Sequence, residues 1–186
     1  GNPGVLPNVQ PAPEVMRLRS SGDLIITLVG GGFETAEQIQ LLIQCLECTS
    51  REWRLIPRWH PKEADRPDPQ NGNRPYRETW DTLLKPLGGR VVRMDKLSIA
   101  RVVVASNIVV SGYSTLLSTA AYYPWCVAVS LQTRKVMQAL AEESPLEQIP
   151  QVKLGISNLV ATPVDLALLK PCSEEARARL LPLDPV

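Results

Sequence analysis

Short apolar segments alternate along this chain with segments whose apolar residues recur at helical spacing. The apolar segments are rich in Val, Ile and Leu, and they predict strands over 24–29, 53–59, 90–94, 108–110, 126–129 and 159–160. Strands of this kind, joined by helices of crossover length, are typical of a parallel sheet that is covered on both faces. The alternation therefore predicts a parallel sheet with helices on both faces.

The intervening helices have recognisable signals. Ile39, Leu42, Ile43 and Leu46 fall at i, i+3, i+4 and i+7, and Thr35 with Gln38 matches a capping box. Further helices are expected over 79–87, 98–105 and 133–143, from residue 116 until a proline at 124, and after a capping serine at 173. Together these elements predict an α/β fold, a Rossmann-like three-layer α/β/α sandwich with a mostly parallel sheet of about six strands.

The chain divides into two unequal parts. Residues 1–20 carry four prolines in the first thirteen positions and little periodicity, which predicts an extended lead-in segment or interdomain linker. Residues 21–186 then form one domain, because 186 residues suffice for one well-buried core and are short for two. The polar segment 61–76 is expected to be a long loop.

Charge and cysteine spacing exclude several functions. Lys and Arg total 20 against 19 Asp and Glu, and no basic stripe interleaves with aromatic residues, so no nucleic-acid partner is expected. No segment is apolar enough for an integral membrane span and no signal-peptide pattern is present, which predicts a cytoplasmic protein. Cys45 and Cys48 have C-x-x-C spacing without a second pair or a nearby His, so they are expected to be buried or half-buried helical thiols. No metal and no cofactor are predicted.

Three polar or glycine-rich segments follow predicted strands. They are Gly30-Gly31-Gly32-Phe33 after the first strand, His60-Pro61 after the second, and Ser111-Gly112-Tyr113-Ser114-Thr115 after the fourth. In parallel sheets, ligands bind at the carboxyl ends of the strands, near the point where the strand order reverses. We therefore expect these segments to form one site.

The serine and threonine turn is the strongest of the three. At a junction between a strand and a helix, the first helical N–H groups lack partners and the helix dipole adds positive charge, so hydroxyl groups there predict a phosphate site. The alternative is helix capping, which needs one hydroxyl, whereas Ser111, Ser114 and Thr115 supply three. Tyr113 either contacts the ligand or packs beside the turn.

The other two segments are less specific. Three glycines let a ligand approach the backbone closely, although a tight turn is an alternative explanation. They do not form a dinucleotide fingerprint, because Thr35 stands at the third glycine position and the second strand ends in Arg58-Trp59-His60, without an acid. His60 is the one histidine of the chain, and Pro61 restricts its backbone, which suits hydrogen-bond donation to a diphosphate or sugar oxygen.

Over residues 23–131, this combination resembles the C-terminal, donor-binding domain of two-domain (GT-B type) glycosyltransferases, in particular the polysaccharide, teichoic-acid and sialic-acid branches. The resemblance implies a cleft between two Rossmann-like domains, in which the C-terminal domain binds the nucleotide and diphosphate of an activated sugar. It implies that residues 111–115 hold phosphate, that His60 contacts phosphate or sugar, and that 31–33 face the donor. An N-terminal Rossmann-like domain would be the partner.

One feature departs from that family. Many of its members place an acid in the helix after the hydroxyl-rich turn to hold the ribose, and no Asp or Glu occurs between Gly112 and Ala141. The leading hypothesis is the donor-binding half of a glycosyltransferase that transfers a sugar to a saccharide or lipid-linked acceptor. The alternatives are a sugar-nucleotide epimerase-like domain and a diverged nucleotide-binding module without catalysis.

Overall fold

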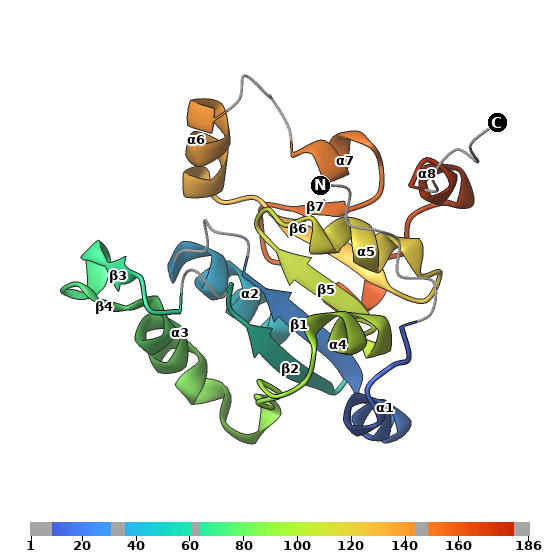
Figure 1. Ribbon diagram of the computed structural model, residues 1–186, viewed down its shortest axis with the longest axis horizontal. Helices are drawn as coiled ribbons and strands as arrows, with labels where there is room; N and C mark the ends of the chain where they lie inside the picture. Colours follow the sequence, from blue (N-terminus) through green and yellow to red (C-terminus); the bar gives the residue numbers. More distant parts are fainter. Residues whose placement is uncertain (1–8, 31–35, 61–63, 144–148, 181–186) are drawn as a thin grey trace.

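Five parallel strands form the centre of the computed structural model, which describes residues 9–30, 36–60, 64–143 and 149–180 (Figure 1). Across the sheet the order is β2 (Trp53–Arg58), β1 (Leu24–Val29), β5 (Ile108–Ser111), β6 (Val127–Leu131) and β7 (Asn158–Val160). Every neighbouring pair is parallel. The chain runs outward from β1 to β2 and then returns past β1 to β5, which places the reversal of strand order between β1 and β5. The α/β, Rossmann-like class is confirmed.

Helices cover both faces of this sheet (Figure 1). One face carries α2 (Ala36–Cys48), α3 (Tyr76–Leu84) and the 3-10 turn η3 (Leu166–Leu168). The other carries α1 (Pro13–Ser20), α4 (Ile99–Ala105), α5 (Leu116–Tyr122) and α8 (Glu174–Ala178). The remaining elements are the hairpin β3 (Pro67–Asp68) and β4 (Arg74–Pro75) with η1 (Pro69–Asn71), and also η2 (Lys85–Arg90), α6 (Arg134–Glu143) and α7 (Pro150–Lys153).

The alternation of side chains along β1 explains the two cores. All six residues of β1 are buried, as expected for a strand covered on both faces. Ile26 and Leu28 belong to the cluster that includes Leu42 of α2, whereas Ile25 packs in the cluster that includes Val102 of α4. The one polar residue of β1 is Thr27. Its hydroxyl forms a hydrogen bond of 2.7 Å with the hydroxyl of Ser106, which follows α4, so the buried Thr27 hydroxyl has a partner.

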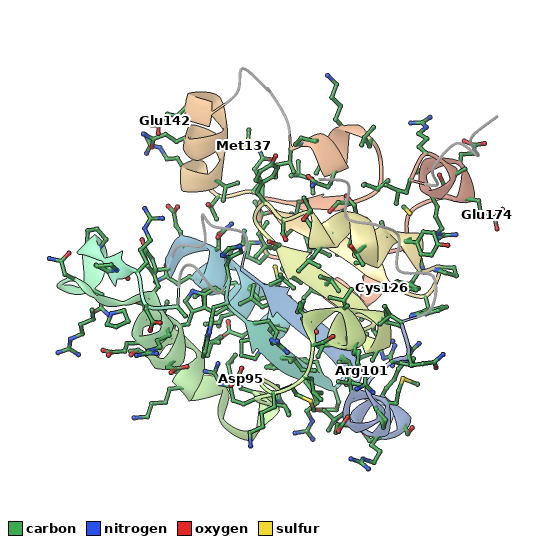
Figure 2. The ribbon with its side chains drawn as sticks, viewed as in Figure 1. Asp95, Arg101, Cys126, Met137, Glu142 and Glu174 are labelled. Carbon is green, nitrogen blue, oxygen red and sulfur yellow. The ribbon has the colours of Figure 1, made fainter. Side chains whose placement is uncertain are left out.

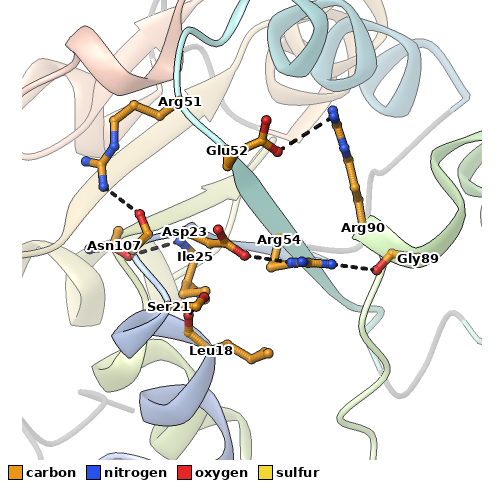
Figure 3. Close-up of polar contacts among 11 residues, drawn as sticks. Leu18, Ser21, Asp23, Ile25, Arg51, Glu52, Arg54, Gly89, Arg90 and Asn107 are labelled. Atoms are coloured by element: carbon orange, nitrogen blue, oxygen red, sulfur yellow. Dashed lines mark hydrogen bonds and ion pairs between the residues drawn. The ribbon is translucent and has the colours of Figure 1, made fainter.

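Polar side chains fix the strands at their amino ends (Figure 3). The side-chain oxygen of Asn107 accepts a hydrogen bond from the backbone N–H of Ile25, and the backbone N–H of Asn107 donates to the Ile25 carbonyl, both at 2.9 Å. Arg54 forms an ion pair with Asp23 at 2.7 Å and donates to the Gly89 carbonyl at 3.0 Å. These bonds set the register of β1 against β5 and β2.

The expected extended conformation of residues 1–20 is wrong for 13–20, which form α1. Pro13 stands in the first turn, where its missing N–H costs nothing and its fixed φ suits the helix. Val15 is fully buried and packs in the same cluster as Ile25. Part of the predicted lead-in segment therefore belongs to the body of the domain, and residues 1–8 lie outside the described ranges.

The predicted strand over 90–94 is also wrong, and the sheet has five strands among the residues that the structure describes. Val91 makes only an isolated parallel bridge to Leu55, and the N–H of Val92 donates to the Leu55 carbonyl at 2.8 Å. Arginine side chains bind the carbonyls on either side of this bridge, since Arg54 donates to Gly89 and Arg58 to Met94. Side-chain bonds thus replace a regular ladder along the edge of β2.

The observed boundaries of other elements differ from the predicted ones by a few residues. The helix expected over 79–87 starts at Tyr76 and changes to 3-10 geometry at Lys85, and the loop over 61–76 contains the β3–β4 hairpin. The predicted cap at Ser173 is confirmed, because its hydroxyl accepts the N–H of Ala176. Ser98 caps α4 in the same way, through the N–H of Arg101, which the sequence analysis did not predict. Within the described residues, no helix is long and apolar enough to cross a bilayer.

Candidate functional site

The carboxyl ends of β2, β1 and β5 lie next to one another. The register pairs Val29 with Arg58 and Leu28 with Val110, so the residues that follow these strands continue side by side. Neighbouring strands are about 4.8 Å apart, and β2 and β5 are therefore separated by about 10 Å across β1. Of the predicted site residues, His60 follows β2 and residues 111–115 begin at the end of β5, so they lie on the two sides of β1. Gly31, Gly32 and Phe33 lie outside the described ranges.

Gly30 touches the end of β2. A Cβ built on Gly30 would lie 2.3 Å from the backbone nitrogen of His60 and 3.0 Å from the carbonyl carbon of Trp59. The N–H of Gly30 donates to the Arg58 carbonyl at 2.8 Å. At position 30, the explanation by tight packing of the chain on itself is therefore sufficient, and no ligand is needed to account for the glycine.

Burial falls steadily along the serine and threonine turn. Ser111 and Gly112 are buried, Tyr113 and Ser114 are half-buried, and Thr115 is exposed. The first residues of the turn therefore anchor it in the protein, and Thr115 presents its side chain to solvent. The five predicted residues form one continuous segment that emerges from the switch point between β1 and β5.

Gly112 is held against the start of α2. A Cβ on Gly112 would lie 1.7 Å from Nε2 of Gln38 and 3.1 Å from a methyl carbon of Val136. Gln38 is fully buried in the first turn of α2, and Val136 is fully buried on α6. The sequence predicted Gln38 only as part of a capping box, whereas its buried side chain supports the turn from α2, a contact for which the sequence holds no local signal.

The Tyr113 side chain packs against α6 and the residues around α7. It joins a small cluster formed by the buried side chains of Val136 and Ile149, with Met137 and Val152 at the margin. Figure 2 shows Met137 on α6, above the carboxyl edge of the sheet. This contact favours the packing alternative for Tyr113, whose ring helps to seat the turn against α6 and α7.

Backbone groups at the start of α5 are already occupied. The N–H of Leu116 donates to Ser114 Oγ at 3.2 Å, and those of Leu117 and Ser118 donate to the carbonyls of Ser114 and Thr115. The expectation that the first helical N–H groups lack partners is therefore wrong for these three residues. Ser114 is the capping hydroxyl, while Thr115 makes no side-chain capping bond. The exposed hydroxyl of Thr115 is thus the polar group of the turn best placed to meet a ligand.

The end of β2 adds a cation. Arg58 is half-buried and donates from Nη1 to the Met94 carbonyl at 2.9 Å. Burial lowers the pKa of Arg58 from its ordinary value, and the nearby charge of Asp95 opposes this shift. Asp95 is exposed. His60 itself is half-buried, and its carbonyl accepts from Ala64 at 3.2 Å.

Metal-binding side chains do not gather in the part of the chain that the structure describes. There, no three residues of the His, Cys, Asp and Glu types come close enough to hold an ion. Cys45 is buried in α2, as expected, whereas Cys48 is exposed, which contradicts the expectation of a buried or half-buried thiol. Burial raises the pKa of the Cys45 thiol, so this thiol stays protonated.

Comparison with known proteins gives no family assignment. No protein-family model matches the chain, and no curated protein matches it. Among solved structures, the chain is similar to the glycotransferase of kitacinnamycin, with 16% sequence identity and a TM-score of 0.41. The match covers 86% of this chain and 38% of that chain. Function therefore has to be inferred from the residues at the switch point.

Proposed function

We propose that this chain binds a nucleotide-activated sugar and forms the donor-binding half of a glycosyltransferase. The observation that carries the proposal is the position of the serine and threonine turn: it leaves β5 at the switch point, is anchored by buried contacts and ends in the exposed hydroxyl of Thr115. Ligands of open parallel sheets bind at this place. The sugar would be transferred to a saccharide or lipid-linked acceptor.

The chemistry requires little of this half of the enzyme. In such a transfer, the bond between the sugar and the diphosphate breaks, and the departing phosphate gains negative charge. Thr115 and His60 would donate hydrogen bonds to it from the two sides of β1, and the half-buried charge of Arg58 would add a favourable field. The base that takes the proton of the acceptor hydroxyl would come from an N-terminal Rossmann-like domain, so this chain alone is expected to transfer little or no sugar.

Titration calorimetry tests the proposal directly. The chain is titrated with CMP, UMP, UDP and GDP, and weak but saturable binding of at least one is expected. Inorganic pyrophosphate serves as the probe for the phosphate contacts alone. If none of the four nucleotides and no pyrophosphate binds, the proposed function is refuted.

Two neighbouring hydroxyl groups distinguish ligand binding from helix capping. Thr115→Ala removes an exposed hydroxyl without a capping bond, so nucleotide affinity should fall about fivefold to tenfold while the melting temperature stays unchanged. Ser114→Ala removes the bond to the Leu116 N–H and should cost about 1 kcal/mol of stability. Calorimetry and thermal unfolding of both variants measure the two effects, and unchanged nucleotide affinity of Thr115→Ala would show that this hydroxyl does not bind phosphate.

A further inference from the structure

The side-chain amide of Gln151 is buried next to the Ser111–Thr115 turn. Gln151, on α7, is 7% exposed, and its Nε2 donates to the Ser114 carbonyl at 3.4 Å. Within the described ranges, its Oε1 is buried and has no hydrogen-bond partner. Because Oε1 shares its carbon with Nε2, this unmatched oxygen lies at the same turn as the Ser114 carbonyl.

Folding stability does not account for this amide. A buried acceptor without a partner loses the hydrogen bonds that it made to water, and a single neutral bond at 3.4 Å returns less than that loss. An apolar side chain of the same length would fill the space without the cost. Unmatched buried polar groups are rare in folded proteins and each needs an explanation; beside a candidate site, a donor group of the bound ligand supplies one.

The chemistry of the oxygen restricts what that partner can be. An amide oxygen only accepts hydrogen bonds, and the oxygens of an ionised phosphate also only accept, so phosphate cannot satisfy Oε1. A hydroxyl group can, because it has a proton to donate. A ligand that pairs with Oε1 must therefore do so through a donor group distinct from the phosphate that Thr115 would hold.

We propose that Oε1 of Gln151 accepts a hydrogen bond from a ribose or sugar hydroxyl of the ligand bound at the Ser111–Thr115 turn. This assignment deepens the proposed function and rests on it. Oε1 is shielded from solvent in the ligand-free structure, so the proposal includes a side-chain rotamer change on binding, which is common at interfaces. Gln151 thus selects ligands that carry hydroxyl groups beside the phosphate.

The test compares Gln151→Met with a matched control, Gln138→Met. Methionine keeps the length of the side chain and removes both amide groups, and Gln138 is an exposed glutamine on α6 that bonds Glu142 at 3.3 Å. Each variant is titrated with pyrophosphate, with the nucleotide among CMP, UMP, UDP and GDP that binds wild type tightest, and with the matching nucleotide sugar. Thermal unfolding is measured without ligand.

Gln151→Met should bind the nucleotide or the nucleotide sugar about fivefold to tenfold more weakly than wild type, with pyrophosphate affinity unchanged. An equal loss for both ligands identifies a ribose hydroxyl, and a loss only for the nucleotide sugar identifies a sugar hydroxyl. The ligand-free melting temperature should stay the same or rise, and Gln138→Met should match wild type in every binding measurement. If Gln151→Met binds all three ligands as wild type does, the hydroxyl assignment is overturned while the phosphate site stands; if wild type binds none of them, the proposed function has failed as well.

Discussion

Replacement of Gly30 by alanine is the sharpest test of how the carboxyl edge is built. The new Cβ would lie 2.3 Å from the His60 backbone nitrogen, which is 1.1 Å short of the 3.4 Å at which ordinary contact begins. The obstacle is main chain at the end of β2, so no side-chain rotation can relieve it. Either β1 or β2 has to move, and the hydrogen bond from the Gly30 N–H to the Arg58 carbonyl weakens.

The expected magnitude follows from three contributions. Overpacking of this kind typically costs about 1–3 kcal/mol. Weakening of the hydrogen bond to Arg58 adds about 0.5–1.5 kcal/mol. The lower entropy of the unfolded chain offsets about 0.4–1 kcal/mol, because Gly30 does not use a left-handed φ. At the midpoints of these ranges the net loss is about 2 kcal/mol, which lowers the melting temperature of a chain of this size by roughly 4–8 °C.

Thermal and urea unfolding measure this loss, and Gly89→Ala is the matched control. A Cβ on Gly89 meets nothing within 4 Å, and Gly89 also lacks a positive φ, so the same substitution there should be neutral or slightly stabilising. The difference between the two variants isolates the contact with β2. If Gly30→Ala unfolds at the same temperature as Gly89→Ala, the close approach of the Gly30 backbone to the His60 backbone is refuted.

Two further predictions concern the turn and a buried thiol. Gly112→Ala and Gln38→Ala should each lower the free energy of unfolding. The loss in the double variant should be smaller than the sum of the two single losses by about 1 kcal/mol, because Gln38→Ala removes the atoms that the new Cβ would strike. Additive losses in urea unfolding would contradict this contact. Burial raises the pKa of the Cys126 thiol to about 12. Above about pH 9 the folded state therefore keeps a proton that the unfolded state releases. As a result, the free energy of unfolding falls as the pH rises from about 9 to 12. The stability gap between wild type and Cys126→Ala in urea unfolding should therefore shrink by on the order of 1–2 kcal/mol between pH 8 and 10.5, and a constant gap would contradict the raised pKa.

The strands at the centre of the sheet could be predicted because their sequence pattern and their environment agree. β1 is apolar at five of six positions and buried at all six, so its bounds were predicted as they are observed. Ile108 and its neighbours in β5 were found for the same reason, with Asn107 marking the start. A strand covered on both faces leaves a continuous apolar segment, which is a local signal.

Elements at the edge of the sheet were predicted less well, because their structure depends on distant partners. Residues 90–94 have strand-forming composition, but Arg54 and Arg58 bind the carbonyls around Val91 and Val92 and replace the regular ladder. Similarly, the prolines before α1 suggested an extended chain, although Val15 is buried against the sheet. Propensity is a weak guide where tertiary contacts decide.

The candidate site shows the same division at the level of single residues. The sequence predicted a hydroxyl-rich turn at the switch point, because strand, turn and helix follow one another within residues 108–122. It could not predict what seats the turn, since Gln151 bonds Ser114 across 37 residues of sequence and Gln38 meets Gly112 from another helix. Both contacts come from buried glutamines, whose polarity alone predicts exposure. The turn at this site therefore rests on two buried amides and on the apolar cluster of Val136 and Ile149, and all of these contacts come from segments far from the turn in sequence.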